Sequence, residues 1–344
     1  MKSYVVAILA VLPLTGAAQA HGIDQFSDWA VTCDNTRHCE AVGYQNMDGD
    51  SLPVELWLAR DAGGGTQVQA RLTVEPIDAD SRPGPLNVQV GALTLAGIKS
   101  KLAIQGAQVA RLLPAMLDAA TAEISDAHNH WTLSLAGLKA ALLKMDDLQG
   151  RIGTAGALIS KGSRAESTVP PPMPVPVLHA AALPVPRDTD DALLAPILKA
   201  VRERKCWDEI ADSDDADDLD GERPAETSVD RVSATQVLVM RECVRYTIQS
   251  SYEIWIAQDK PPYSPQRVEL PPAVGGEDSG LTSLEFSRGV LTSAARANWN
   301  DCGNSQSWLW TSKGFMLLEA SARPMCRMVR EGAALRTWQA RRAD

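Results

Sequence analysis

The stretch at residues 28–44, DWAVTCDNTRHCEAVGY, has two cysteines that bracket five polar residues between two apolar runs. The apolar runs have the composition of β-strands, and the polar residues have the composition of a turn. We therefore predict a β-hairpin in which a Cys33–Cys39 disulfide closes the turn. A ring of this size is expected to stabilise the fold by roughly 2 kcal/mol.

The spacing of these two cysteines argues against two other uses. Zinc sites usually contain close pairs such as CxxC, whereas five residues separate this pair, with His38 adjacent to the second cysteine. Redox pairs usually stand as CxxC at the start of a helix, where the helix dipole lowers the thiol pKa. We therefore predict a structural disulfide, with zinc binding and redox chemistry as the less favoured alternatives.

The first residues have the order of a secretory signal: Lys2, then the apolar run YVVAILAVLPLTG, then small residues ending at Ala20. We predict a cleavable signal peptide over 1–20 and a secreted mature chain that starts at His21 in the periplasm of a Gram-negative bacterium. The apolar run has about 13 residues, fewer than the ~20 of a membrane-spanning helix. No transmembrane segment is predicted in the mature chain. Export to an oxidising compartment favours disulfides.

The composition limits the partners that the chain can bind. The 344 residues carry a formal net charge of −10, and 45% of them are hydrophobic. An acidic chain is a poor partner for nucleic acid and for anionic membrane surfaces, because their phosphate groups repel it. The length and the apolar content suffice for two cores of ordinary size.

A proline-rich segment at 161–187, KGSRAESTVPPPMPVPVLHAAALPVPR, divides the chain. It predicts a linker between an N-terminal domain at 21–160 and a C-terminal domain at 188–344. In a polyproline conformation, residues 170–186 would extend over roughly 50 Å and could hold the domains apart. The alternative is that this segment lies along the surface of one domain.

The N-terminal domain is expected to be β-rich. Apolar and polar residues alternate in the runs 54–60 and 67–74, which is the pattern of strands with one wet face. Gly63 to Gly65 lie between these runs and predict a hairpin turn.

Apolar residues at helical spacing predict two helices in the same domain, near 107–122 and 136–149. Pro114 is expected at the start of the first helix or at a kink in it. Ser134 is the expected N-cap of the second helix, and Gly150 is expected to end it.

The C-terminal domain is expected to begin with a short amphipathic helix through Leu194 and Val201 and to continue as strands from Ser233 to Trp338. Short strands separated by turns favour an antiparallel meander. The predicted fold class is thus mainly β (β-rich α+β), with two antiparallel β-sandwich or partial-barrel modules and a few short helices.

Four more cysteines follow the linker, namely Cys206, Cys243, Cys302 and Cys326. They admit three connectivities. Pairing in sequence order, Cys206 with Cys243 and Cys302 with Cys326, requires the least threading and is the one that we predict. Each of these rings is expected to contribute roughly 3 to 4 kcal/mol.

Several motifs occur in a fixed order along the chain: DWAVTCDNTRHCEAVGY, AALLKMDDLQGRIGT, CWDE, NDCGNSQSWLWTSKGFML, and MCR followed by TWQA. As an ordered set they resemble a secreted bacterial family known only as domain of unknown function 1176. The resemblance covers nearly all of the mature chain and implies export, a two-part architecture and no established activity. The first half is also similar to the invasion-associated locus B proteins, which share a tryptophan and cysteine opening and a later SLxGLxxAL stretch.

The acidic segment at 208–222 is the candidate metal site. Clustered carboxylates suit calcium, which prefers oxygen ligands. The candidate ligands are Asp212, Asp214, Asp218 and Asp220. If Gly221 is aligned with the turn glycine of an EF-hand, Ala216 occupies the first ligand position, so that motif fails. A solvated acidic loop is the alternative, and no cofactor is predicted.

Trp308 and Trp310 share one face of a predicted strand and are the candidate ligand-binding residues. They would either fill the core or form an aromatic platform for a glycan or a partner.

The sequence contains no GxSxG, HExxH or SxxK motif with which a catalytic site could be placed. We therefore expect a non-enzymatic binding or interaction module of the cell envelope, whose partner is an unknown envelope protein or ligand. One alternative is a periplasmic hydrolase or glycan-modifying enzyme whose site is assembled only in the fold. Another is binding of calcium or a different metal through residues 208–222.

Overall fold

The computed structural model describes residues 22–78, 81–201, 224–246, 248–272, 281–296 and 301–343. The predicted signal peptide lies outside the described residues. So do Cys206 and the candidate calcium ligands Asp212, Asp214, Asp218 and Asp220.

The described part of the chain begins with a five-stranded antiparallel sheet whose strands follow one another in sequence order. The strands are β1 (Asp24–Phe26), β2 (Trp29–Cys33), β3 (Cys39–Tyr44), β4 (Val54–Arg60) and β5 (Val68–Val74). Both predicted hairpins are present. Cys33 lies opposite Cys39 at the end of the first hairpin, and a disulfide joins them. In the turn of the second, Gly63 and Gly65 have φ of 91° and 73°, which glycine adopts at low cost.

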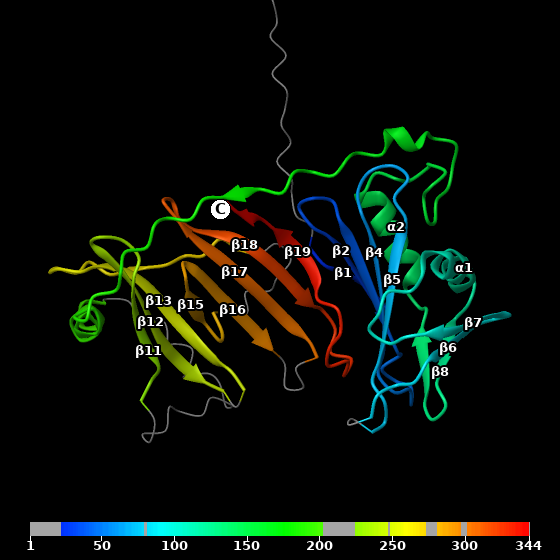
Figure 1. Cartoon of the computed structure of the whole chain (residues 1–344), viewed down its shortest axis with the longest axis horizontal. Helices are drawn as coiled ribbons and strands as arrows, with labels where there is room; N and C mark the ends of the chain where they lie inside the picture. Colours follow the sequence, from blue (N-terminus) through cyan, green and yellow to red (C-terminus); the bar gives the residue numbers. More distant parts are fainter. Residues whose placement is uncertain are drawn as a thin grey trace, which may run out of the picture.

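A second sheet and two helices complete the N-terminal half (Figure 1). They are β6 (Leu86–Val90), β7 (Leu93–Ile98), α1 (Gly106–Leu117), β8 (Thr121–Ser125), β9 (His130–Ser134) and α2 (Leu138–Leu148). The sheet has the strand order β7-β6-β8-β9. Side chains of both sheets and both helices form one core, in which Trp29 and Trp131 are 0% exposed.

Pro114 lies inside α1, so of its two expected positions the helix start is excluded. The expected N-cap of the second helix was wrong. Ser134 does not cap α2, because it is the last residue of β9. The N-cap of α2 is Gly137, with φ of 98°. A side chain at Gly137 would collide with the backbone of Phe26, where a Cβ would lie 1.8 Å from the carbonyl oxygen.

The C-terminal half contains two antiparallel sheets in sequence order, as expected of a meander. The first comprises β11 (Thr227–Arg231), β12 (Gln236–Arg245), β13 (Ser250–Gln258) and β14 (Gln266–Arg267). The second comprises β15 (Glu285–Ser287), β16 (Val290–Arg296), β17 (Gly303–Thr311), β18 (Gly314–Arg323) and β19 (Leu335–Gln339).

The two C-terminal sheets share a core, to which Leu238 and Ile254 contribute from the first sheet and Leu291 and Trp308 from the second. The other face of the first sheet is covered by η2 (Asp191–Leu193) and α3 (Leu194–Ala200), whose Ile197 is 0% exposed. The described part of the chain is therefore β-rich, with several antiparallel sheets and few short helices.

The proline-rich segment lies along the surface of both halves. After η1 (Glu166–Thr168), residues 170–183, here called the strap, cross from the N-terminal to the C-terminal half (Figure 1). The amide of Met173 donates a hydrogen bond to the Thr36 carbonyl over 3.1 Å, and the amide of Ala181 donates to Trp310 over 3.0 Å. Between these points β10 (Val177–Leu178) pairs in parallel with β20 (Arg341–Arg342). The strap therefore does not hold the halves apart.

The two halves also contact each other directly. Val329 and Leu335 of the C-terminal half pack in one apolar cluster with Ala30, Val42 and Tyr44 of the N-terminal sheet. We call this contact, between β2–β4 and residues 325–339, the joint. Since the core covers one face of β2 and β3 and the joint covers the other, every residue of both strands is buried. No helix among the described residues is long and apolar enough to cross a membrane.

Candidate functional site

The turn of the first hairpin forms one side of the joint. Asp34 in this turn is 1% exposed. Its Oδ1 accepts hydrogen bonds from the amide and the hydroxyl of Thr36, which shape the turn. Its Oδ2 accepts from Arg336 Nε over 2.8 Å and from Gln339 Nε2 over 2.7 Å. One carboxylate thus fixes the turn and attaches it to β19.

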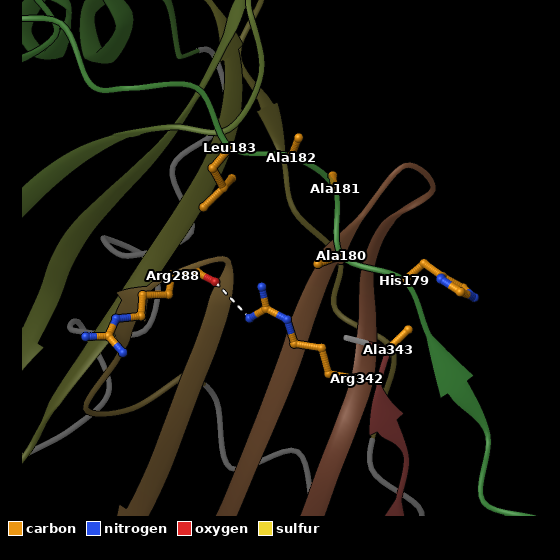
Figure 2. Close-up of a pocket in the computed structure, with 8 residues that line it drawn as sticks. All are labelled: His179, Ala180, Ala181, Ala182, Leu183, Arg288, Arg342 and Ala343. Carbon is orange, nitrogen blue, oxygen red and sulfur yellow. Dashed lines mark hydrogen bonds between the residues drawn. The ribbon is translucent and has the colours of Figure 1, made fainter.

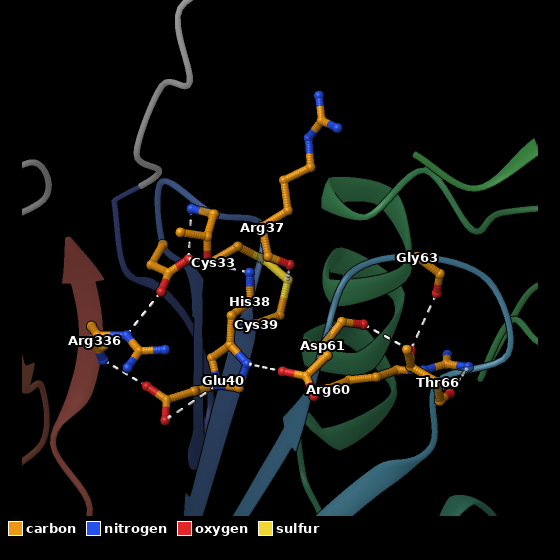
Figure 3. A network of polar contacts seen from close by, with 12 residues as sticks. Cys33, Arg37, His38, Cys39, Glu40, Arg60, Asp61, Gly63, Thr66 and Arg336 are labelled. Atoms are coloured by element: carbon orange, nitrogen blue, oxygen red, sulfur yellow. Dashed lines mark hydrogen bonds and ion pairs between the residues drawn. A yellow bond between two sulfur atoms is a disulfide. The ribbon is translucent and has the colours of Figure 1, made fainter. Parts of the chain in front are cut away.

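Two further carboxylates lie beside this turn (Figure 3). Glu40 accepts a hydrogen bond from the backbone amide of Arg336 over 2.6 Å and another from Trp57 Nε1 over 3.2 Å. His38 Nδ1 lies 2.7 Å from Asp61 Oδ1, and its Nε2 lies 3.8 Å from Glu40 Oε1. The imidazole is therefore held between two carboxylates, next to the Cys33–Cys39 disulfide.

Burial and the neighbouring carboxylates shift the pKa of His38 in opposite directions. Burial lowers the pKa of His38, whereas the contacts with Glu40 and Asp61 raise it, and the net effect is a raised pKa. A raised folded-state pKa means that the contribution of His38 to stability is fully present below its unfolded pKa. That contribution is lost as the pH rises through the folded-state value.

We expect His38→Asn to destabilise the protein by up to about 1 kcal/mol at about pH 5.5 and by less at about pH 8, because only the imidazolium attracts both carboxylates. Urea unfolding of both proteins at the two pH values measures this. Asp61→Asn removes one carboxylate, so the same comparison in that background should show a smaller pH dependence. Equal destabilisation by His38→Asn at both pH values would contradict the prediction.

Further contacts lie on the other side of the joint. Arg327 and Asp28 are 7% and 8% exposed, and their ion pair spans 2.9 Å. Gln45 donates to the Arg327 carbonyl over 2.8 Å. Both oxygens of Glu55, which is 0% exposed, accept from the amide of Ala333. Burial raises the pKa of Glu55 despite this hydrogen bond. These contacts thus comprise one buried ion pair between the halves and hydrogen bonds from side chains of the N-terminal half to the backbone of the C-terminal half.

A groove of about 640 Å³ opens where the strap crosses the C-terminal half. Its lining consists of strap residues 179–183 together with Arg288, Arg342 and Ala343. Figure 2 shows the Arg342 side chain extended across the groove, with its guanidinium donating to the Arg288 carbonyl over 3.3 Å. The side chains of His179 and Arg288 point away from Arg342 in the same view. The groove therefore has an apolar wall and a basic edge.

The predicted disulfides are found wherever both cysteines are described. Cys33 is bonded to Cys39, and Cys302 is bonded to Cys326. Cys243 is also in a disulfide. Its predicted partner, Cys206, lies outside the described residues. The Cys302–Cys326 bond closes the segment that leads into the joint.

The two candidate tryptophans lie on the core side of β17. Trp308 is 1% exposed, and its Nε1 donates to the Pro271 carbonyl over 2.9 Å. Trp310 is partly buried, donates to the Val232 carbonyl, and has its ring centroid 5.0 Å from that of Phe315. Both side chains therefore contribute to packing between the two C-terminal sheets.

Sequence reasoning did not identify the polar residues of the joint. Asp34 and Arg336 are separated by 302 positions, and no local pattern connects them. The polar side chains between Cys33 and Cys39 were the one sequence signal for this site, and they predicted only a turn. Neither did the sequence indicate the groove beneath the strap.

The fold and these contacts define a class of protein with two β-rich halves that a strap and a polar joint hold together. The chain belongs to the family described as "Protein of unknown function (DUF1176)", whose model matches residues 23–341. It is similar to "Uncharacterized protein YpfG" of Escherichia coli (strain K12), with 27% identity over 346 residues and 94% of each chain covered. No solved structure matches significantly. The resemblance of the first half to the invasion-associated locus B proteins stays a prediction.

Proposed function

We propose that the protein is exported to the periplasm and acts there by binding an anionic segment of an envelope partner, and not by catalysis. The observation that carries this proposal is the groove beneath the strap. The secretory pattern of residues 1–20 and the disulfides support the location, because disulfides persist in oxidising compartments.

The chemistry of the groove favours an anionic partner. Arg342 is exposed and donates to a neutral carbonyl, so that contact does not cancel its positive charge. Arg288, also in the lining, is exposed, and its side chain points away from Arg342 (Figure 2). A planar guanidinium can donate two parallel hydrogen bonds to a carboxylate. The apolar wall of Ala180 to Leu183 offers contact area next to this charge.

The contacts of the joint support a role in holding the shape of the molecule. The His38 side chain lies between Asp61 and Glu40, and Glu40 accepts a hydrogen bond from the backbone amide of Arg336, so these contacts link the two halves. Hydrolysis or glycan modification at a site formed only in the fold, and metal binding through residues 208–222, stay as alternatives.

The test is affinity capture from the periplasm of the native host, with a tag inserted in the exposed turn at Gly49. We expect the recovered chain to start at His21 and to retain a partner. Arg342→Glu should reduce the recovered partner about 10-fold, because it reverses the charge at the groove. The matched control is Arg330→Glu, at an exposed arginine outside the groove lining, which should leave recovery unchanged.

Three outcomes would count against the proposal. A recovered chain that retains residues 1–20 would contradict export. Equal loss of the partner in Arg342→Glu and in Arg330→Glu would show that the groove does not select it. Turnover of the captured partner by the purified protein would favour the enzymatic alternative.

A further inference from the structure

A second groove, of about 430 Å³, lies between α1 and β5 in the N-terminal half. Its volume is within the usual range of small-molecule sites, about 300–1,000 Å³. The walls are mostly apolar, and they include Val68, Val109, Leu113 and Leu158. None of the contacts described for the joint or for the strap groove uses these side chains.

One charged side chain, Arg60, is among the described residues that line this groove. Arg60 is 4% exposed. Its guanidinium donates to two backbone carbonyls, of Thr66 and Gly156, over 2.9 to 3.0 Å. Arg60 NH1 also forms an ion pair with Asp146 Oδ1 over 3.7 Å, a distance longer than a hydrogen bond. Figure 3 shows Arg60 and Thr66 together at the end of β4.

Arg60 retains N–H donors that the contacts above do not use. Burial, together with the charge of nearby Arg151, lowers the pKa of Arg60 to about 10, although Asp146 and Glu166 act in the opposite direction. A guanidinium has five N–H donors, and the contacts above use three of them. A further anionic acceptor at this end of the groove would therefore be stabilised.

The start of α1 adds a second group of donors to the same groove. Gly106 and Ala107, the first residues of the helix, belong to the lining. The N-cap residue, Gln105, makes no side-chain capping hydrogen bond, and the first turn contains no acidic residue. The first amides of a helix have no partner within the helix and favour negative charge. The buried guanidinium and the uncapped helix start thus favour the same kind of ligand.

We propose that the groove between α1 and β5 binds a single-chain carboxylate amphiphile, with its head group at Arg60 and the start of α1 and its hydrocarbon chain along the apolar walls. Carboxylate oxygens match the donors of the guanidinium. The hydrocarbon chain would bury apolar surface against Val109 and Leu113. This site is separate from the strap groove and goes beyond the proposed function.

The probe is decanoate, titrated calorimetrically into the oxidised full-length mature chain below its micelle-forming concentration. We expect saturable binding that is at least about 10-fold tighter than that of 1-decanol, which has the same chain and no charge. Ala110→Trp should weaken decanoate binding at least about 10-fold, because Ala110 lines the groove and is exposed, so that a large ring fills the groove without disturbing the core.

The matched control is Ala96→Trp, at an exposed position of β7 that is absent from the groove lining. It should bind decanoate like the unmodified protein. Three results would overturn the inference: no decanoate binding at up to about 1 mM, equal affinity for decanoate and 1-decanol, or unchanged decanoate binding in Ala110→Trp. The comparison of decanoate with 1-decanol uses the unmodified protein, with no substitution at Arg60. A folding defect therefore cannot obscure its result.

Discussion

Replacing Arg327 by methionine is expected to lower the free energy of unfolding by about 3 to 5 kcal/mol. The substitution leaves the carboxylate of Asp28 buried without its partner, 2.9 Å from where the guanidinium lay. It also removes the hydrogen bond from Arg327 to the Gln45 carbonyl. Because an unpaired buried charge is costly, the joint should weaken more than the loss of a surface ion pair would imply. Urea unfolding of the oxidised protein measures the change.

A double variant distinguishes the cost of the unpaired Asp28 charge from a general loss of packing at Arg327. In the double variant Asp28→Asn with Arg327→Met, the unpaired charge is gone, so part of the stability should return. Arg330→Met, at an exposed arginine of the same segment, should change stability by no more than about 0.5 kcal/mol. A loss below about 1 kcal/mol for Arg327→Met would show that the ion pair does not hold the joint together.

Gly43→Ala is expected to destabilise the protein by about 3 kcal/mol, an effect at the upper end for overpacking. Gly43 lies directly opposite Trp29 in the β2–β3 pair. A Cβ at Gly43 would lie 2.1 Å from the indole ring of Trp29, which is 0% exposed and donates to the Ser134 carbonyl. The ring has no room to retreat, because the whole of β2 is buried.

Gly49→Ala is the matched control. Its added Cβ would meet no atom closer than 3.6 Å, in ordinary van der Waals contact. Thermal unfolding should therefore show a large fall of the midpoint for Gly43→Ala and little change for Gly49→Ala. If both variants unfolded at the same temperature as the unmodified protein, the close packing of Trp29 against Gly43 would be wrong.

Local patterns were enough to predict many elements of this fold. Alternation in 54–60 and 67–74 predicted β4 and β5, and the Cys33–Cys39 spacing predicted the first hairpin and its disulfide. These signals concern neighbours in the sequence, where the period of the backbone determines which side chains share a face. Tertiary packing overrode a local preference at Ser134, which resembles an N-cap but ends a strand.

The candidate sites depended on contacts that no local pattern encodes. The strap groove brings residues 179–183 beside Arg288 and Arg342, and the joint brings Asp34 beside Arg336. The groove at Arg60 needs α1 to lie against β5. Such contacts form only when the whole chain packs together. A single sequence does not show which of its distant segments will lie side by side.

The joint also determines the order in which this chain can complete its fold. The outer face of β2 and β3 is covered by residues 325–339, which are synthesised long after these two strands. Until that segment is made, Val42 and Tyr44 lack the apolar contacts of Val329 and Leu335 on this face. Contacts between segments so distant in sequence form slowly, because a long loop must close first. The N-terminal half is thus synthesised before the segment that covers its sheet, so a chain truncated before residue 325 would leave apolar side chains on this face exposed and prone to aggregation.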